Sequence, residues 1–152
     1  MFIHSNGLVW LRSRDMILTT EQEHAFKLFK EKKNIFITGP AGTGKSHLIK
    51  HICNECKQSD RMVGVTAMTG SAAYLIGGST LHSWAGIGLG DKAADILIEQ
   101  INRIYPLRMR WLRAKTLIID EVSMLTQELF EKLDVIGKVI RKKHLFPFGG
   151  IQ

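Results

Sequence analysis

Three short apolar runs recur along the chain, and longer segments with helical periodicity separate them. The runs span residues 35–38, 62–66 and 116–120. Runs of this length between polar or glycine residues are typical of strands that are buried on both faces. Because strands alternate with helices, the pattern predicts an α/β fold with a parallel sheet flanked by helices.

Four segments have the spacing of apolar positions that is typical of helices on a protein surface. The first, residues 19–33, carries Thr20 and Glu23 at the spacing of a capping box. Its apolar stripe comprises Ala25, Phe26, Leu28 and Phe29. Pro106 should end the helix expected over residues 91–105, because proline cannot continue a helical hydrogen-bond ladder. The remaining helices are expected over residues 45–57, 91–105 and 127–142.

The composition fits one globular domain. Of 152 residues, 45% are hydrophobic and 23% are charged, which suffices to bury one core. Twenty-one Lys and Arg against 14 Asp and Glu leave a net charge of +7, which favours polyanionic partners without naming one. Residues 103–115 hold five basic side chains and no acidic one. Such a segment is typical of a solvated basic face or of a nucleic-acid contact.

Two features bear on the location of the protein. No apolar run approaches the roughly 18 residues that span a membrane, so we expect a soluble intracellular protein without a membrane partner. The first 14 residues lack acidic side chains and contain two Arg and two Ser. Transit peptides share this composition, but an ordinary N-terminal tail over residues 1–16 is the favoured interpretation.

The two cysteines, Cys53 and Cys56, form a C-x-x-C motif flanked by His47 and His51. A structural zinc site needs four converging ligands. These four residues do not share one helical face, and the sequence has no second C-x-x-C motif. The pattern therefore favours two reduced thiols over a metal site, which suits a reducing compartment.

The stretch GPAGTGKS, residues 39–46, follows the first apolar run with the spacing of a phosphate loop. Between a strand and a helix, such a loop points backbone N–H groups at phosphate oxygens. Lys45 should reach the β and γ phosphates of ATP, and Ser46 should give a hydroxyl ligand to Mg²⁺. The predicted nucleotide-binding residues are Gly39, Pro40, Ala41, Gly42, Thr43, Gly44, Lys45 and Ser46.

Two adjacent carboxylates, Asp120 and Glu121, close the third apolar run in LIIDEVSM. Ligands of parallel sheets bind at the carboxyl ends of the strands, so both should face the crevice that holds the phosphate loop. Asp120 is expected to hold the Mg²⁺ shell, and Glu121 to polarise a water against the γ-phosphate. A water-activating carboxylate favours hydrolysis over transfer to a substrate hydroxyl. Lys45, Asp120 and Glu121 are thus the predicted catalytic residues; two solvated acids at a strand end are the alternative.

Five stretches in this order resemble the petite integration frequency (PIF) family of DNA helicases, which are 5′-to-3′ motors of superfamily 1. They are LTTEQ, GPAGTGKS, VTAMTGSAAYLIGGSTLHSWAGIG, LIIDEVSM and LFEKLDVIGKVIRKKHLFPFGGIQ. The third stretch and the closing PFGGIQ are specific to this family, whereas GPAGTGKS and IIDE are shared by many ATPases. The residue types depart from the commonest family pattern at Met68, Ser71, Tyr74 and Trp84. None of these departures removes a charged or hydroxyl group that the chemistry needs.

The resemblance implies that residues 17–152 form the first RecA-like ATP-binding domain of a helicase. In that family, a Gln upstream of the phosphate loop reads the adenine, and here it corresponds to Gln22. Thr69, Gly70, Thr80 and His82 would contact the backbone of single-stranded DNA, which positions a strand without reading its sequence. Trp84 would stack on a base or pack into the core, and packing is the favoured interpretation.

The resemblance also implies cofactors, partners and processes. The cofactors would be ATP and Mg²⁺, and the partners single-stranded DNA and 5′-tailed duplex DNA. The processes would be DNA repair, recombination or telomere maintenance, in the nucleus or mitochondrion of a eukaryote. A nucleotide-binding or single-strand-binding module without motor activity is the alternative.

Family members continue beyond the position of Gln152 into a further strand and a Gly-Asp-x-x-Gln-Leu-Pro-Pro motif. That strand lies between the phosphate-loop strand and the strand predicted at 116–120. The resemblance therefore predicts that the RecA-like domain is incomplete at its C-terminus, with two strands lacking a partner between them. A second RecA-like domain would donate arginines to the transferring phosphate.

Overall fold

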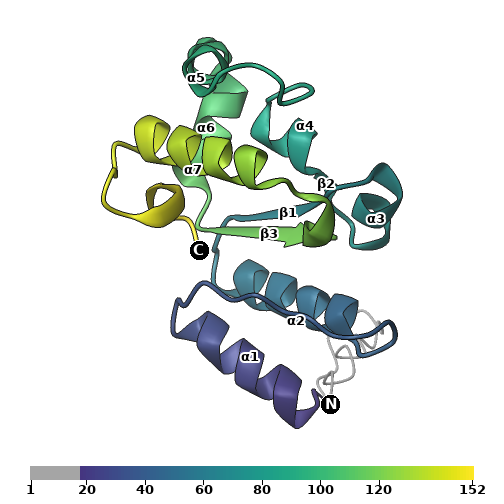
Figure 1. Cartoon of the computed structure of the whole chain (residues 1–152). Coiled ribbons are helices and arrows are strands. Elements are labelled where there is room, and N and C mark those ends of the chain that lie inside the picture. The colour runs from purple at the N-terminus through teal and green to yellow at the C-terminus, as the bar shows by residue number, and fades with distance from the viewer. Residues whose placement is uncertain (1–17) are drawn as a thin grey trace, which may run out of the picture.

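The computed structural model describes residues 18–152, and its centre is a parallel three-stranded sheet with the order β2–β1–β3 (Figure 1). The strands are β1 (Val63–Ala67), β2 (Ser79–Thr80) and β3 (Thr116–Asp120). β1 pairs with β3 along its whole length, and its last residue, Ala67, lies opposite both Asp120 and Thr80. The predicted parallel sheet is confirmed, and β1 and β3 lie within one residue of their predicted positions.

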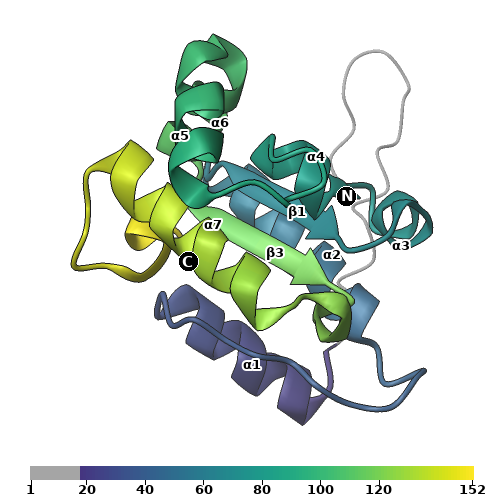
Figure 2. The ribbon, with the colours of Figure 1, turned by 45° about the horizontal axis from the view of Figure 1, so that its top comes forward.

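Helices cover both faces of the sheet, as Figures 1 and 2 show. One face carries α1 (Thr20–Lys30) and α2 (Lys45–Gln58). The other carries α4 (Leu81–Ala85), α5 (Ala94–Arg103), α6 (Tyr105–Arg113) and α7 (Gln127–Arg141). α3 (Gly70–Leu75) lies beside β1 and β2, and the 3-10 turns are η1 (Val122–Met124) and η2 (Pro147–Gly150).

Each face of the sheet has its own core. The α1–α2 face buries Phe29, Leu48, Ile52 and Cys56. On the other face, the rings of Trp84 and Trp111 lie 5.0 Å apart between centroids. Trp84 also lies so close to Gly64 that a Cβ there would come within 2.6 Å of the indole. Trp84 is therefore a core residue, as the favoured interpretation expected.

The capping box predicted at Thr20 and Glu23 is wrong by one residue. Thr19 is the N-cap, and its hydroxyl accepts a hydrogen bond from the Gln22 N–H at 3.3 Å. In return, the Gln22 carboxamide oxygen accepts from the Thr19 N–H at 3.0 Å. Both registers place Glu or Gln three residues after Thr, so local spacing alone does not separate them.

The prediction that Pro106 ends a single helix over 91–105 is also wrong. α5 ends at Arg103, and Pro106 stands in the first turn of α6, where a missing N–H leaves no helical bond unmade. Most of the basic segment 103–115 is therefore helical. One of its five basic side chains is structural, because Arg110 donates to the carbonyls of Ser83 and Trp84.

The predicted buried strand at 35–38 is wrong. This segment joins no sheet, and the Phe36 side chain is 75% exposed. A groove of about 410 Å³ lies between the segment and β3, so the segment has no neighbouring backbone to pair with. Ile35, Phe36 and Ile37 line one side of the groove, and residues 116–120 line the other.

The outer edge of β3 is paired only at its start within the described residues. The Gln152 N–H donates to the Lys115 carbonyl at 3.1 Å, and the Leu117 N–H donates to the Gln152 carbonyl at 2.7 Å. These two bonds form one rung of a parallel ladder. The Gln152 side chain donates to the carbonyls of Phe29 and Lys33, so it bridges the two walls of the groove. The groove lies where the resemblance expects a further strand.

Arg141 fixes the chain segment that leads to Gln152. Its guanidinium donates to four carbonyls at 2.6–3.0 Å, those of Gly149, Trp111, Leu112 and Ala114. Burial lowers the pKa of Arg141, but a guanidinium stays charged in proteins. These four hydrogen bonds join η2 to the end of α6, and they hold the chain that leads to Gln152 against the edge of β3.

Two further findings concern the cysteines and the membrane. Cys53 and Cys56 are free thiols in α2, and burial raises the pKa of both. Between residues 18 and 152, no three His, Cys, Asp or Glu side chains are grouped so that they could hold a metal ion. In the same range, every helix is too short or too polar to cross a lipid bilayer. The tail predicted over residues 1–16 lies outside the described residues.

Candidate nucleotide site and nucleic-acid interface

The phosphate loop joins segment 33–38, which belongs to no helix or strand, to α2. Its Gly44 is the N-cap of α2 with φ of +83°, a left-handed conformation that favours glycine. Lys45 and Ser46 are the first two residues of the helix. The loop therefore ends at a helix N-terminus, where backbone N–H groups lack helical partners and favour anions.

Lys45 lies folded over the start of the loop. Its ammonium group donates to the carbonyls of Gly39 and Pro40 at 2.7 and 2.9 Å. The Thr43 hydroxyl donates to the same Pro40 carbonyl at 2.9 Å. Ala41 and Gly42 are exposed at the tip of the loop. An ammonium group beside helix-start N–H groups is a set of donors that fits the oxygens of a triphosphate.

Asp120 and Lys45 line the same groove, one from the end of β3 and the other from the start of α2. The carboxylate of Asp120 accepts a hydrogen bond from the Glu121 N–H at 3.0 Å. Glu121 itself has φ of +55°, an unusual conformation for a residue with a side chain, and it turns the chain sharply into η1. Ser46 and Glu121 are both exposed, and neither lines the groove.

Gln22 reaches the phosphate loop from the first turn of α1. Its amide nitrogen donates to the carbonyls of Thr43 and Gly44 at 3.2 and 3.3 Å. The side chain is half-buried rather than a free surface group. Nothing in the spacing of the sequence indicated this contact, because it joins residues that are 21 and 22 positions apart.

The four predicted DNA-contact residues follow strands β1 and β2. Thr69 and Gly70 follow β1 after one intervening residue, Met68, and Thr80 is the last residue of β2. The register brings Thr80 and Asp120 to the two sides of Ala67 at the carboxyl edge of the sheet. The candidate DNA contacts therefore lie on the same edge as Asp120, separated from it by one strand.

Both threonines already serve as helix caps. The Thr69 hydroxyl accepts from the Ala72 N–H at 3.2 Å and starts α3, and the Thr80 hydroxyl accepts from the Ser83 N–H at 3.3 Å and starts α4. A hydroxyl that accepts one bond can still donate its own hydrogen to a phosphate oxygen. His82 lies half-buried in α4.

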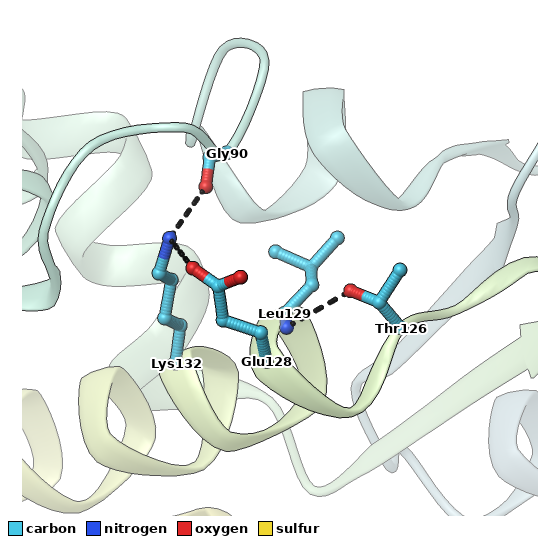
Figure 3. A network of polar contacts seen from close by, with 5 residues as sticks. All are labelled: Gly90, Thr126, Glu128, Leu129 and Lys132. Atoms are coloured by element: carbon cyan, nitrogen blue, oxygen red, sulfur yellow. Dashed lines mark hydrogen bonds and ion pairs between the residues drawn. The ribbon is translucent and has the colours of Figure 1, made fainter.

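A lysine that the sequence did not single out joins α7 to the loop that follows α4 (Figure 3). Lys132 donates to the Gly90 carbonyl at 3.1 Å and pairs with Glu128 at 2.8 Å. Gly90 lies beside α4, since a Cβ there would be 3.8 Å from the His82 ring. Figure 3 also shows Thr126 capping α7 through the Leu129 N–H. A lysine in a helix carries no sequence signal for such a contact.

Known proteins resemble most of this chain. The family model described as PIF1-like helicase matches residues 17–152. The ATP-dependent DNA helicase RRM3 of Saccharomyces cerevisiae is 45% identical over 143 residues, which are 92% of this chain and 20% of that protein. An uncharacterized protein, 030L, of Invertebrate iridescent virus 6 is 48% identical over 139 residues, or 89% of this chain and 26% of that protein.

A solved structure shares the fold. The crystal structure of Pif1 helicase from Candida albicans superposes with a TM-score of 0.85 at 45% identity, covering 90% of this chain and 31% of that chain. The predicted RecA-like α/β fold is therefore confirmed. The chain spans about a third or less of the length of each of these relatives.

Proposed function

Because the chain belongs to the PIF1-like helicase family, we propose that it supplies the ATP-binding part of an ATP-dependent 5′-to-3′ DNA helicase. One observation carries the proposal: Lys45 and Asp120 line one groove, and Asp120 ends its strand at the sheet edge where β2 ends in Thr80. Only strand β1 separates Asp120 from Thr80, so nucleotide chemistry and a DNA contact would be neighbours at this edge. The motor activity belongs to a longer protein, whose length this chain covers in part.

In this proposal, the phosphate loop from Gly39 to Ser46 binds the triphosphate of ATP, and Lys45 donates to its β and γ phosphates. Ser46 and Asp120 would hold Mg²⁺, which would neutralise charge on the phosphates. Glu121 orients and deprotonates the attacking water. Gln22 contacts the adenine, as the family resemblance implies.

Single-stranded DNA is the proposed partner, and the helicase would bind it first at the 5′ single-stranded tail of a duplex. Thr69, Gly70, Thr80 and His82 contact its phosphates, which fixes the strand without selecting a sequence. Repair, recombination and telomere maintenance are the processes that use such a motor, in the nucleus or mitochondrion of a eukaryote. A nucleotide-binding or single-strand-binding module without motor activity is the second candidate, because the phosphate loop and the strand contacts named above would serve such a module equally well.

The coding sequence beyond the codon for Gln152 separates these two candidates. A motor requires a Gly-Asp-x-x-Gln-Leu-Pro-Pro motif followed by a second RecA-like domain. If the reading frame contains neither within about 300 codons, the motor proposal fails, since domains of this type have 100–200 residues each.

We expect Glu121→Gln to retain ATP binding in the full-length protein while slowing hydrolysis by about a hundredfold or more, because the amide cannot take a proton from water. The measurement is single-turnover hydrolysis alongside equilibrium binding of Mg·ATP. Glu99→Gln, which changes an exposed glutamate on α5, is the matched control and should hydrolyse at the wild-type rate. Undiminished hydrolysis in Glu121→Gln would place the base elsewhere.

We expect Thr80→Ala and His82→Ala to weaken single-strand binding about two- to tenfold, and equally for different sequences, because phosphate contacts carry no sequence information. Fluorescence anisotropy with two unrelated oligonucleotides measures this. Thr80→Ser keeps the hydroxyl that caps α4 and should bind like the wild type. If neither Thr80→Ala nor His82→Ala alters DNA-stimulated ATP hydrolysis, the assignment of these residues is wrong.

A further inference from the structure

We propose that Gln22 is a positioning residue for the phosphate loop, and that it raises affinity for the triphosphate group whatever base the nucleotide carries. The inference rests on the proposed function, because it concerns the same nucleotide site. It differs from the adenine contact that the family resemblance assigns to Gln22. A base contact acts on one end of the nucleotide, whereas this contact acts on the loop that holds the other end.

The carboxamide of Gln22 has protein partners at both ends. Its oxygen accepts from the Thr19 N–H at 3.0 Å, and its nitrogen donates to the carbonyls of Thr43 and Gly44 at 3.2 and 3.3 Å. An N–H requires an acceptor and a carbonyl requires a donor, so only one orientation of the carboxamide satisfies all three partners. The side chain thus joins the start of α1 to the end of the loop.

These contacts fix the two peptide planes that end the loop. In a trans peptide, the C=O and the following N–H lie in one plane and point in opposite directions. Holding the carbonyl of Thr43 therefore orients the N–H of Gly44, and holding the carbonyl of Gly44 orients the N–H of Lys45. Both N–H groups then point away from Gln22, at the N-terminus of α2, where an anion is favoured.

Gly44 permits this close approach. A Cβ at this residue would lie 2.4 Å from the amide nitrogen of Gln22, and the φ of +83° also disfavours a side chain. The Gly44 carbonyl accepts from the Leu48 N–H at 3.0 Å as well, which is the first hydrogen bond of α2. One carbonyl with two lone pairs therefore serves both the helix and Gln22.

The test compares three ligands in the full-length protein: Mg·ATP, Mg·GTP and magnesium tripolyphosphate, which has no base. Gln22→Ala should weaken all three, and tripolyphosphate by about three- to tenfold, as expected for two lost hydrogen bonds. The Leu48 amide, which donates to the Gly44 carbonyl at the end of the loop, should also exchange with deuterium faster in this variant. Competition against a fluorescent nucleotide gives the affinities.

Thr19→Ala is the matched control. It removes the hydroxyl that caps α1 but keeps the Thr19 N–H and both loop contacts of Gln22. Tripolyphosphate affinity and the exchange rate of the Leu48 amide should stay within about twofold of wild type, although the helix cap is lost. Equal losses in Thr19→Ala and Gln22→Ala would show that helix stability alone is responsible, and would overturn the inference.

A second result also overturns it. If Gln22→Ala weakens Mg·ATP but leaves tripolyphosphate unchanged, Gln22 acts only on the base, while the proposed nucleotide site stands. A wild-type protein that binds none of the three ligands would instead contradict the proposed function, and the inference with it. If Gln22→Ala weakens tripolyphosphate binding and also weakens ATP binding more than GTP binding, then Gln22 contacts both the loop and the adenine.

Discussion

Lys45→Ala should weaken binding of Mg·ATP to the full-length protein by about a thousandfold and remove nearly all turnover. The ammonium group would make two charge-assisted bonds to phosphate oxygens, and bonds of this kind contribute about 1.5–3 kcal/mol each. Their loss corresponds to roughly 4 kcal/mol, or three factors of ten. The same group also donates to the carbonyls of Gly39 and Pro40 within the loop, so alanine should loosen the loop as well.

Lys50→Ala is the matched control for this prediction. Lys50 lies on the same helix, is exposed, and is not part of the loop. Its replacement changes the net charge equally but should leave affinity within about twofold, since exposed charges at a distance are screened by salt. Isothermal titration with Mg·ATP measures both variants. Equal affinity for Lys45→Ala and wild type would mean that the loop is not a phosphate site.

The parts of the fold that the sequence predicted share one property: their pattern is local. β3 was predicted over its full length because the apolar residues 117–119 are followed directly by two acids. α2 and α7 were predicted within one residue at each end, because apolar spacing and polar caps agree there. The phosphate loop was found from fixed spacing alone. Each of these signals lies within about fifteen residues of sequence.

The errors arise where distant segments decide the structure. The apolar run at 35–38 looks like a buried strand, but a strand forms only when a second backbone lies alongside. The contact of Gln22 with the loop and the contact of Lys132 with Gly90 likewise join residues that are far apart. The short helices α3 and α4 begin at threonine caps inside a glycine-rich stretch, where composition alone favours a loop.

We expect the chain of residues 1–152, on its own, to be only marginally stable. The groove beside β3 is lined by apolar side chains from both walls, and by Ile49 and Ile52 of α2. A strand in that groove would bury about four apolar side chains at roughly 1.5–3 kcal/mol each. That sum is comparable to the whole free energy of unfolding of a small domain, about 5–15 kcal/mol.

Thermal melting with and without Mg·ATP tests the expectation. A longer chain that continues past Gln152 through the next strand is the matched control, because Gln152 already forms the first rung on the edge of β3. The longer chain should melt cooperatively at a temperature higher by ten degrees or more, since about 1 kcal/mol shifts the melting temperature of a domain of this size by roughly 2–8 °C. Coincident cooperative melts of the two chains would contradict the expectation, because they would show that the groove does not lower the stability of residues 1–152.

The same chain should also fail to separate a 5′-tailed duplex, whatever the concentration of ATP. Unwinding requires two domains that close on the nucleotide, so that each hydrolysis step moves one against the other. Glu121 would act without arginines to stabilise charge on the transferring phosphate. An arginine in that role raises the rate of hydrolysis by about 10³–10⁵-fold. Weak nucleotide binding and very slow hydrolysis are therefore the most that residues 1–152 should show. Strand separation driven by ATP with this chain alone would mean that stepping does not need a second domain.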